Sequence, residues 1–216
     1  ELERKSCEVV FLCNPNNPTG RLVPPALLES ILALCERRGG WLFVDECFLE
    51  LSDGGRGTSL APLLRPGRRL FLLRAFTKSY AMAGLRLGYC LCGEGALLER
   101  MGRQTQPWNM SVPAQAGGLA ALGEEAYLRE SRALIQSERR YLQEGLEALG
   151  LTVCPSQANY LLVKSPAELS GPLLDRGILI RDCANYRGLG PGWYRTAVRR
   201  REENRTLLKA LGEILG

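Results

Sequence analysis

The sequence predicts an α/β protein in which a mainly parallel sheet is followed by a smaller α+β region. Over the first hundred or so residues, short apolar runs alternate with segments of helical periodicity, as in sheets whose strands are joined by helices. From about Ser111 the pattern changes to a long helical stretch, and then to short strands with helices between them. We therefore expect the C-terminal part of a large domain over residues 1–110, a connecting helical region over 111–149 and a small domain over 150–216.

Four apolar segments of the first region fit strands: "EVVFLC", "WLFVDECFLEL", "RRLFLLRAF" and "LGYCLCG". The second is apolar on consecutive positions, which suits a strand buried on both faces of a parallel sheet. A helix is predicted over "LVPPALLESILALCERRGG", because prolines stand at its start and two glycines follow its end. "EGALLERMGRQ" fits a short helix. The chain opens without a methionine and almost directly on a strand, so we expect further sequence upstream.

The middle region is predicted to be helical, with a break near Gly123. Leu128, Ile135, Leu142 and Leu149 repeat along one helix face, as in an amphipathic helix. The last region contains strand-like segments, a helix between two of them and an amphipathic helix at the end. The strand-like segments are "LTVCP", "ANYLLVK", "GILIRD" and "WYRTAV".

Composition excludes several classes of function. The 216 residues are 45% hydrophobic with a formal net charge of +5, which is ordinary for a globular protein. No apolar run approaches the roughly 18 residues that a membrane helix needs, and no export signal is visible at the start. The chain contains no histidine, which excludes Ser/His/Asp hydrolysis and acid–base catalysis by histidine.

The eight cysteines form no CxxC pair, so no zinc site is expected and the metal prediction is none. Cysteines inside apolar runs such as "YCLCG" behave as small hydrophobic residues, and reduced thiols favour a cytoplasmic protein. The basic run "RTAVRRREENR" has glutamates beside it and no interleaved aromatic residues. It is better interpreted as a solvated helix start than as a nucleic-acid interface. We therefore expect neither nucleic acid nor membrane as a partner.

Lys78 is the first residue with candidate chemistry. It follows the strand-like run "LFLLRAF" and lies eight residues before Arg86, which has glycines near it on both sides. A solvated surface lysine is the ordinary alternative. A lysine desolvated at a strand end can instead attack a carbonyl, while Thr77 and Arg86 offer a hydroxyl and a guanidinium to a phosphate. Amine chemistry on an aldehyde beside a phosphate site is the chemistry of pyridoxal phosphate.

Asp45 and the stretch "NPNNPTG" extend this hypothesis. Asp45 follows four apolar residues near the end of a predicted buried strand, where a carboxylate is costly unless it is paired. It can cap a turn, or it can hold the protonated ring nitrogen of pyridoxal phosphate. "NPNNPTG" alone predicts a rigid turn, and an amide such as Asn17 can donate to the phenolate oxygen of the cofactor.

Taken in this order, the motifs resemble fold-type I pyridoxal-phosphate enzymes of the aminotransferase class I/II family, along the whole chain. The resemblance implies an aspartate aminotransferase-like fold, a homodimer and pyridoxal 5'-phosphate as cofactor. It implies cofactor contacts from the asparagine of NPTG, the aspartate of DE-x-aromatic, the lysine and the arginine of GLRLGY. These are Asn17, Asp45, Lys78 and Arg86. Relatives also carry an upstream glycine-rich phosphate turn and a stacking aromatic residue, which these 216 residues do not include.

Within the family, "FTK" before "YAMAGLRLGY", and then "ILIRDCANYRGL", look similar to the threonine-phosphate decarboxylases of cobalamin biosynthesis. Phe48 follows DE-x where the aminotransferases more often have a tyrosine, and the decarboxylases tend to carry phenylalanine. Ala75 is a departure, because relatives usually place a hydroxyl there for the phosphate; Thr77 and Arg86 would then have to hold it.

For Arg181 and Arg195 the resemblance implies a grip on the substrate anion, and the hypothesis is that they hold a substrate phosphate. Asn159 is expected either to support this end of the site or to be a structural amide. The predicted reaction is decarboxylation of L-threonine O-3-phosphate. The alternatives are a histidinol-phosphate-type aminotransferase and a pyridoxal-phosphate-binding module without catalysis.

Overall fold

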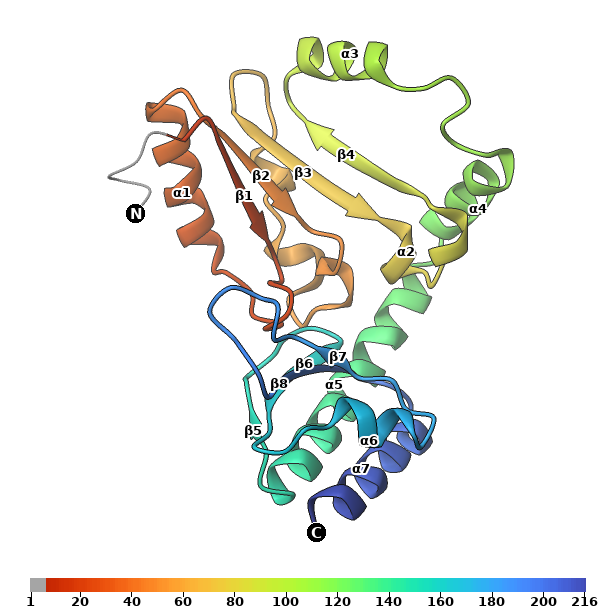
Figure 1. Cartoon of the computed structure of the whole chain (residues 1–216). Helices are drawn as coiled ribbons and strands as arrows, with labels where there is room; N and C mark the ends of the chain where they lie inside the picture. Colours follow the sequence, from red (N-terminus) through yellow and green to blue (C-terminus); the bar gives the residue numbers. More distant parts are fainter. Residues whose placement is uncertain (1–6) are drawn as a thin grey trace. The chain divides into compact units, whose positions relative to one another are not determined.

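A computed structural model describes residues 7–216 (Figure 1). The chain divides into two compact units. Unit 1 comprises the residues up to Pro15 together with Val23–Arg129, and unit 2 comprises Asn16–Leu22 together with Glu130–Gly216. The "NPNNPTG" stretch therefore leaves unit 1 after Pro15, and the long helix α5, Glu125–Ala148, begins in unit 1 and continues in unit 2.

Unit 1 is built on a four-stranded sheet in the order β1-β2-β3-β4. The strands are β1 (Val9–Cys13), β2 (Trp41–Asp45), β3 (Leu70–Ala75) and β4 (Gly88–Cys92). The first three run parallel to one another, and β4 is antiparallel to β3. The prediction of a mainly parallel α/β sheet is confirmed.

Helix α1 (Pro25–Arg37) covers this sheet with the apolar side chains predicted from its periodicity. Leu28 and Leu32 are fully buried and pack with Leu42 and Leu72 from the strands. The remaining helices of the unit are short: α2 (Phe76–Ser79), α3 (Gly95–Gln104) and α4 (Val112–Leu122). Helix α4 ends immediately before Gly123 and α5 begins at Glu125, so the predicted break is confirmed.

The segment "WLFVDECFLEL" is shorter as a strand than predicted. It ends at Asp45 and continues through a turn into the short 3-10 helix η1 (Leu49–Leu51). Two further 3-10 turns follow, η2 (Gly55–Thr58) and η3 (Ala61–Leu63), and a fourth, η4 (Ala83–Leu85), precedes β4. The strand stops because the Asp45 side chain accepts the backbone N–H of Cys47, which turns the chain out of the sheet.

Unit 2 contains a second four-stranded sheet, antiparallel throughout, in the order β5-β6-β8-β7. Its strands are β5 (Thr152–Val153), β6 (Tyr160–Lys164), β7 (Arg181–Asp182) and β8 (Trp193–Ala197). Helices α6 (Ser170–Leu174) and α7 (Arg201–Leu215) complete the unit with α5. Its core joins Leu142 and Leu146 of α5 to Leu161 of β6 and Leu211 of α7. "LTVCP" and "GILIRD" form only two-residue strands.

Candidate active site

The predicted cofactor residues of unit 1 lie at one edge of its sheet. Because β1, β2 and β3 are parallel, their carboxyl ends meet at the same edge, and open α/β sheets bind ligands there. Asp45 ends β2, and α2 with Thr77 and Lys78 follows β3 directly. Antiparallel β4 starts at this edge (Figure 1), where Gly88 pairs with Ala75. Arg86 comes two residues before Gly88 and therefore lies near this edge.

Asp45 is held from several sides at the end of β2. Its Oδ1 accepts the backbone N–H of Cys47 at 2.9 Å, and its backbone oxygen accepts the N–H of Asn14 at 2.9 Å. Cys13 is its direct partner on β1, and the Cys13 Sγ lies 4.0 Å from Oδ2. The carboxylate therefore has a fixed orientation at the strand end.

Lys78 points back toward this strand end. Its Nζ lies 5.6 Å from the centroid of the Phe48 ring, which follows Asp45 by three residues. Its positive charge also acts on the Cys47 thiol, lowering a pKa that burial and the Asp45 carboxylate raise. The Lys78 side chain is exposed, so the desolvation expected for a nucleophilic lysine is not present in this structure.

Thr77 and Arg86 are the predicted phosphate ligands. Thr77 is half-buried in α2, and Arg86 is exposed, with a left-handed backbone (φ 53°) and a hydrogen bond from Nη1 to the Ala83 carbonyl at 3.1 Å. Helix α2 has only four residues, so its dipole adds little to anion binding, and Ala75 at its N-cap has no hydroxyl that could donate to a phosphate. Binding of a phosphate at this edge would depend on the two side chains.

Glu46 is an important residue that the sequence analysis missed. Its buried carboxylate accepts hydrogen bonds from Arg74 at 2.8 Å, from the Ser59 hydroxyl at 2.8 Å and from the Leu60 backbone N–H at 3.1 Å. This network fixes the residue beside Asp45 and ties the end of β2 to β3. The signal was present in the sequence, since Glu46 and Arg74 are charged residues within strongly apolar runs.

Unit 2 brings together two of the other predicted residues. Asn17 Oδ1 accepts a hydrogen bond from Arg195 Nη1 at 2.5 Å. The Arg195 guanidinium lies 5.4 Å from the centroid of the Tyr160 ring, and the Tyr160 hydroxyl donates to the Asn16 carbonyl at 3.1 Å. The asparagine of NPTG and the arginine of "WYRTAV" thus form one cluster in unit 2.

Arg181 and Arg195 are direct partners across the antiparallel pair of β7 and β8. Directly opposed residues project from the same face of a sheet, with Cβ atoms about 5 Å apart. The two arginine side chains therefore leave the sheet from neighbouring positions on one face. Arg181 donates to Asn185 at 3.2 Å and is exposed, whereas Arg195 is half-buried. Asn159 pairs its carbonyl with the Val198 N–H, and its buried Oδ1 has no hydrogen-bond partner among the described residues.

The side chains of unit 1 fit the chemical groups of pyridoxal phosphate. A fixed carboxylate suits a protonated ring nitrogen, a primary amine beside it suits an aldehyde, and a guanidinium with a hydroxyl suits a phosphate. Asp45, Lys78 and the pair of Arg86 and Thr77 supply these groups at one sheet edge. Within residues 7–216, no group of three or more His, Cys, Asp or Glu side chains is placed to hold a metal ion.

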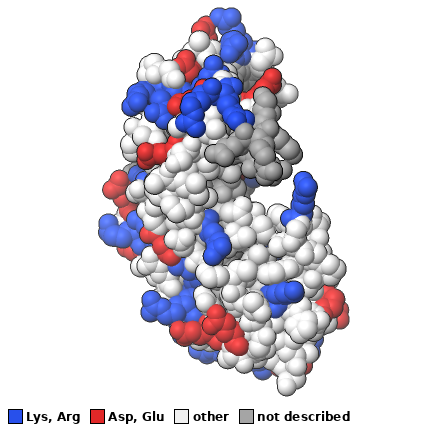
Figure 2. Space-filling view, turned by 90° about the vertical axis from the view of Figure 1, so that its left-hand side faces the viewer, with Lys and Arg blue, Asp and Glu red and all other residues white. Residues whose placement is uncertain are grey.

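A basic surface cluster lies away from this site. Basic side chains gather at the upper end of the view in Figure 2. In the sequence, unit 1 carries Arg37, Arg38, Arg65 and Arg69 near the end of α1 and before β3. This is where α1 ends and β3 begins, the opposite end of the sheet from Asp45. Arg69 there donates to the Gly39 carbonyl at 2.6 Å. The basic cluster is therefore not a part of the predicted cofactor site.

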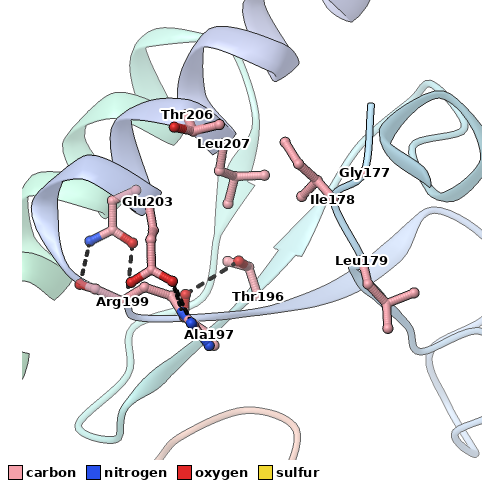
Figure 3. Close-up of a pocket in the computed structure, with 10 residues that line it drawn as sticks. Gly177, Ile178, Leu179, Thr196, Ala197, Arg199, Glu203, Thr206 and Leu207 are labelled. Atoms are coloured by element: carbon pink, nitrogen blue, oxygen red, sulfur yellow. Dashed lines mark hydrogen bonds and ion pairs between the residues drawn. The ribbon is translucent and has the colours of Figure 1, made fainter. Parts of the chain in front are cut away.

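A cavity of about 450 Å³ in unit 2 is lined by residues of β8, of α7 and of the segment that precedes β7 (Figure 3). Its polar groups bind one another. Glu203 pairs with Arg199, and the buried Asn204 accepts the Arg199 N–H at 3.0 Å and donates to its carbonyl at 2.7 Å. None of the residues predicted for the cofactor or the substrate lines this cavity. No described helix is long and apolar enough to cross a membrane.

Comparison with known proteins identifies the family of this chain. The profile of the family "Aminotransferase class I and II" matches residues 1–211. The chain is 38% identical over 212 residues to the threonine-phosphate decarboxylase of Salmonella typhimurium, covering 96% of this chain and 58% of that protein. It is also 38% identical over 220 residues to the histidinol-phosphate aminotransferase of Anaeromyxobacter sp., covering 100% of this chain and 59% of that protein. The chain thus spans somewhat under three fifths of the curated relatives that it matches.

Solved structures show the same fold. The histidinol-phosphate aminotransferase of Clostridium acetobutylicum superposes with a TM-score of 0.90 at 29% identity, over 96% of this chain and 64% of that chain. The Sinorhizobium meliloti histidinol-phosphate aminotransferase, solved in complex with pyridoxal-5'-phosphate, has a TM-score of 0.83 at 26% identity, over 99% and 59% of the two chains. The predicted fold and cofactor are confirmed at the level of the family. The chain belongs to the aminotransferase class I and II family, whose cofactor is pyridoxal phosphate.

Proposed function

We propose that the protein decarboxylates L-threonine O-3-phosphate to 1-aminopropan-2-ol phosphate with pyridoxal phosphate, as a step of cobalamin biosynthesis. The observation that carries this choice is the Phe48 ring beside the Lys78 amine, 5.6 Å from Nζ. A tyrosine at this position would offer a hydroxyl to the phenolate oxygen of the cofactor, as the aminotransferases of the family tend to do. Phenylalanine offers only a ring face, as the decarboxylases of the family tend to do.

The residues of unit 1 have separate roles in this proposal. Lys78 would hold the aldehyde carbon of the cofactor, Asp45 its protonated ring nitrogen, and Arg86 with Thr77 its phosphate. When bound, pyridoxal phosphate supplies a ring that withdraws electrons from a bond at the α carbon of the substrate. In the proposal, the exposed Lys78 amine would also return a proton to that carbon once the carboxylate has left as CO₂.

The arginines of unit 2 would select and orient the substrate. A phosphate dianion matches two guanidinium groups, and Arg181 and Arg195 start from directly opposed positions. If both hold the substrate phosphate, the α-carboxylate is left without an arginine from this pair and is free to depart. Asn17, which accepts from Arg195 at 2.5 Å, keeps that guanidinium in place. We also propose that Asn159 supports the part of the site that these arginines form.

A histidinol-phosphate-type aminotransferase is the second candidate, because a relative with that activity is equally similar at 38% identity. The two reactions differ in their products. The full-length protein, supplied with pyridoxal phosphate and threonine phosphate, is expected to release CO₂ and aminopropanol phosphate. Formation of glutamate from 2-oxoglutarate and histidinol phosphate, without CO₂ from threonine phosphate, would replace the first proposal with the second.

A module that binds the cofactor without catalysis is the remaining alternative, and it is tested by both products being absent while the cofactor still binds. The attachment site can be read directly, since the chain has only four lysines: Lys5, Lys78, Lys164 and Lys209. Reduction with borohydride followed by peptide mass spectrometry is expected to find the cofactor on Lys78. Its appearance on another lysine would overturn the assignment.

The proposal also includes a homodimer and a cytoplasmic location, the latter because none of the eight cysteines forms a disulfide.

A further inference from the structure

Tyr160 of β6 lies beside the Asn17–Arg195 contact, and the proposed function gives it no role. The residue is only 3% exposed. Its hydroxyl donates to the Asn16 carbonyl oxygen at 3.1 Å, and its ring centroid lies 5.4 Å from the Arg195 Cζ. Tyr160 is opposite Ala197 on β8, two residues beyond Arg195, so it is a diagonal neighbour of that arginine on one face of the sheet. The ring and the hydroxyl thus each have a partner in this cluster.

The Asn16 carbonyl anchors the loop that carries Asn17. Besides the Tyr160 hydroxyl, it accepts the Gly20 N–H at 2.7 Å, which closes a turn around Asn17. The loop is bound at its far end by Gln157, whose backbone N–H donates to the Gly20 carbonyl at 2.8 Å. The hydrogen bond from Tyr160 lies at the other end, one residue before Asn17. It therefore connects that end of the loop to β6.

The Asn16 carbonyl belongs to the peptide group that leads into Asn17. Because a peptide group is planar, a bond that fixes this oxygen also fixes the direction in which the chain enters Asn17. Asn17 Oδ1 accepts from Arg195 Nη1 at 2.5 Å, so the direction of the Asn17 side chain sets where the guanidinium is held. We propose that Tyr160 is a positioning residue for Arg195, which its hydroxyl orients through the Asn16–Asn17 peptide. This inference rests on the proposed function, in which Arg195 holds the substrate phosphate.

The loop contact is tested in the full-length protein without added cofactor. Tyr160→Phe keeps the ring and removes the hydroxyl. Hydrogen exchange of a peptide that covers residues 16–22, followed by mass spectrometry, is expected to be about three- to tenfold faster in this variant. Tyr194→Phe is the matched control, because Tyr194 is buried in the same unit and its hydroxyl accepts the Leu169 N–H at 3.2 Å. Exchange of this peptide at the wild-type rate in Tyr160→Phe would overturn the proposal.

The effect on Arg195 is tested by steady-state kinetics with threonine phosphate. Tyr160→Phe is expected to raise KM about three- to tenfold and to leave kcat within about twofold of wild type, because a binding contact is weakened equally in the substrate complex and in the transition state. A merely structural loss would lower the amount of folded enzyme, and so the apparent kcat, without changing KM. Tyr194→Phe is expected to keep the wild-type KM.

The outcomes separate this inference from the proposed function. Wild-type KM in Tyr160→Phe, with kcat/KM lowered in Arg195→Ala, would overturn the inference and leave the proposed function standing. A wild-type enzyme that releases no CO₂ from threonine phosphate would overturn the proposed function instead. The KM for histidinol phosphate in the same variants would then decide whether Tyr160 positions Arg195.

Discussion

At the scale of single residues, Arg195 is the side chain on which substrate selection depends in the proposal. It is half-buried, bound to Asn17 and packed on the Tyr160 ring, so its guanidinium is held before any substrate arrives. Arg199, four residues later, is exposed and pairs with Glu203 in the next turn of chain. The two arginines are close in sequence, but the proposal gives a substrate contact only to Arg195.

We therefore expect Arg195→Ala to lower kcat/KM for threonine phosphate by about 10- to 100-fold, as expected for loss of hydrogen bonds to a charged group. Arg199→Ala is the matched control and is expected to leave kcat/KM within about twofold of wild type, because its ion pair is exposed. Steady-state kinetics at limiting and saturating substrate checks both. If Arg195→Ala kept wild-type kinetics at both concentrations, the substrate grip would be wrong.

Gly20 shows how one residue fixes the Asn17 loop. It has φ +73°, and a Cβ there would lie 2.0 Å from the Ser156 Oγ and 2.8 Å from its Cβ. Ser156 cannot move away easily, because its hydroxyl donates to the Tyr160 carbonyl at 2.7 Å and accepts the Ala158 N–H at 3.1 Å. The close approach lets the Gln157 N–H reach the Gly20 carbonyl at 2.8 Å.

Gly20→Ala is accordingly expected to destabilise the protein by about 2–4 kcal/mol, from left-handed strain together with the steric clash. Gly150 has a similar φ of +79°, but no atom lies within 4 Å of the position that a Cβ would take there. Gly150→Ala should therefore cost only the strain, about 1–2 kcal/mol. Urea unfolding of the two variants measures the difference. Equal decreases in the free energy of unfolding would mean that the contact with Ser156 adds no cost to a Cβ at position 20.

At the scale of elements, helices α5 and α7 are joined by a polar cluster in unit 2. Glu138 of α5 accepts hydrogen bonds from Arg201 at 2.9–3.1 Å and from the buried Asn204 at 3.0 Å. The Arg201 guanidinium also stacks 3.8 Å from the Tyr141 ring centroid. The hydrogen bond from Arg201 is the main reason why the pKa of Glu138 lies below its ordinary value.

A carboxyl group with a lowered pKa stabilises the folded state above its unfolded pKa of about 4.5 and loses this contribution as the pH falls below it. We expect Glu138→Gln to reduce the free energy of unfolding at pH 7 by about 1–2 kcal/mol and to weaken the loss of stability as the pH falls below about 4.5. The exposed Glu202→Gln in α7 is the control. Urea unfolding across this pH range checks the slope, and an unchanged acid slope in Glu138→Gln would contradict the assignment.

The elements were largely predictable from the sequence, and the site was predictable only in part. Apolar runs and the prolines and glycines around α1 place most strands and helices, because local patterning and burial agree there. The prediction that this strand continues beyond Asp45 was wrong. An aspartate whose side chain caps the following turn cannot be told, from the sequence alone, from one more residue of an apolar strand. The Asn17–Arg195 contact was also not predictable, because it joins residues 178 positions apart in the chain.

At the scale of the whole molecule, the predicted groups divide between the two units. Asp45, Thr77, Lys78 and Arg86 belong to unit 1, whereas Asn17, Arg181 and Arg195 belong to unit 2. Helix α5 runs through both, and its residues enter the core of unit 2. A ligand that binds the folded chain and not the unfolded chain stabilises it by mass action, so cofactor binding should be visible in global stability.

Pyridoxal phosphate at about 100 times its dissociation constant is expected to stabilise the full-length protein by about 2.7 kcal/mol, which raises its Tm by several degrees. Lys78→Ala keeps the groups proposed for the ring nitrogen and the phosphate but loses the covalent attachment, so its shift at the same cofactor concentration should be clearly smaller. Lys164→Ala changes an exposed lysine of β6 and is expected to behave as wild type. Differential scanning calorimetry with and without cofactor measures all three. A shift as large in Lys78→Ala as in wild type would show that the amine at position 78 does not hold the cofactor, even if the protein binds it.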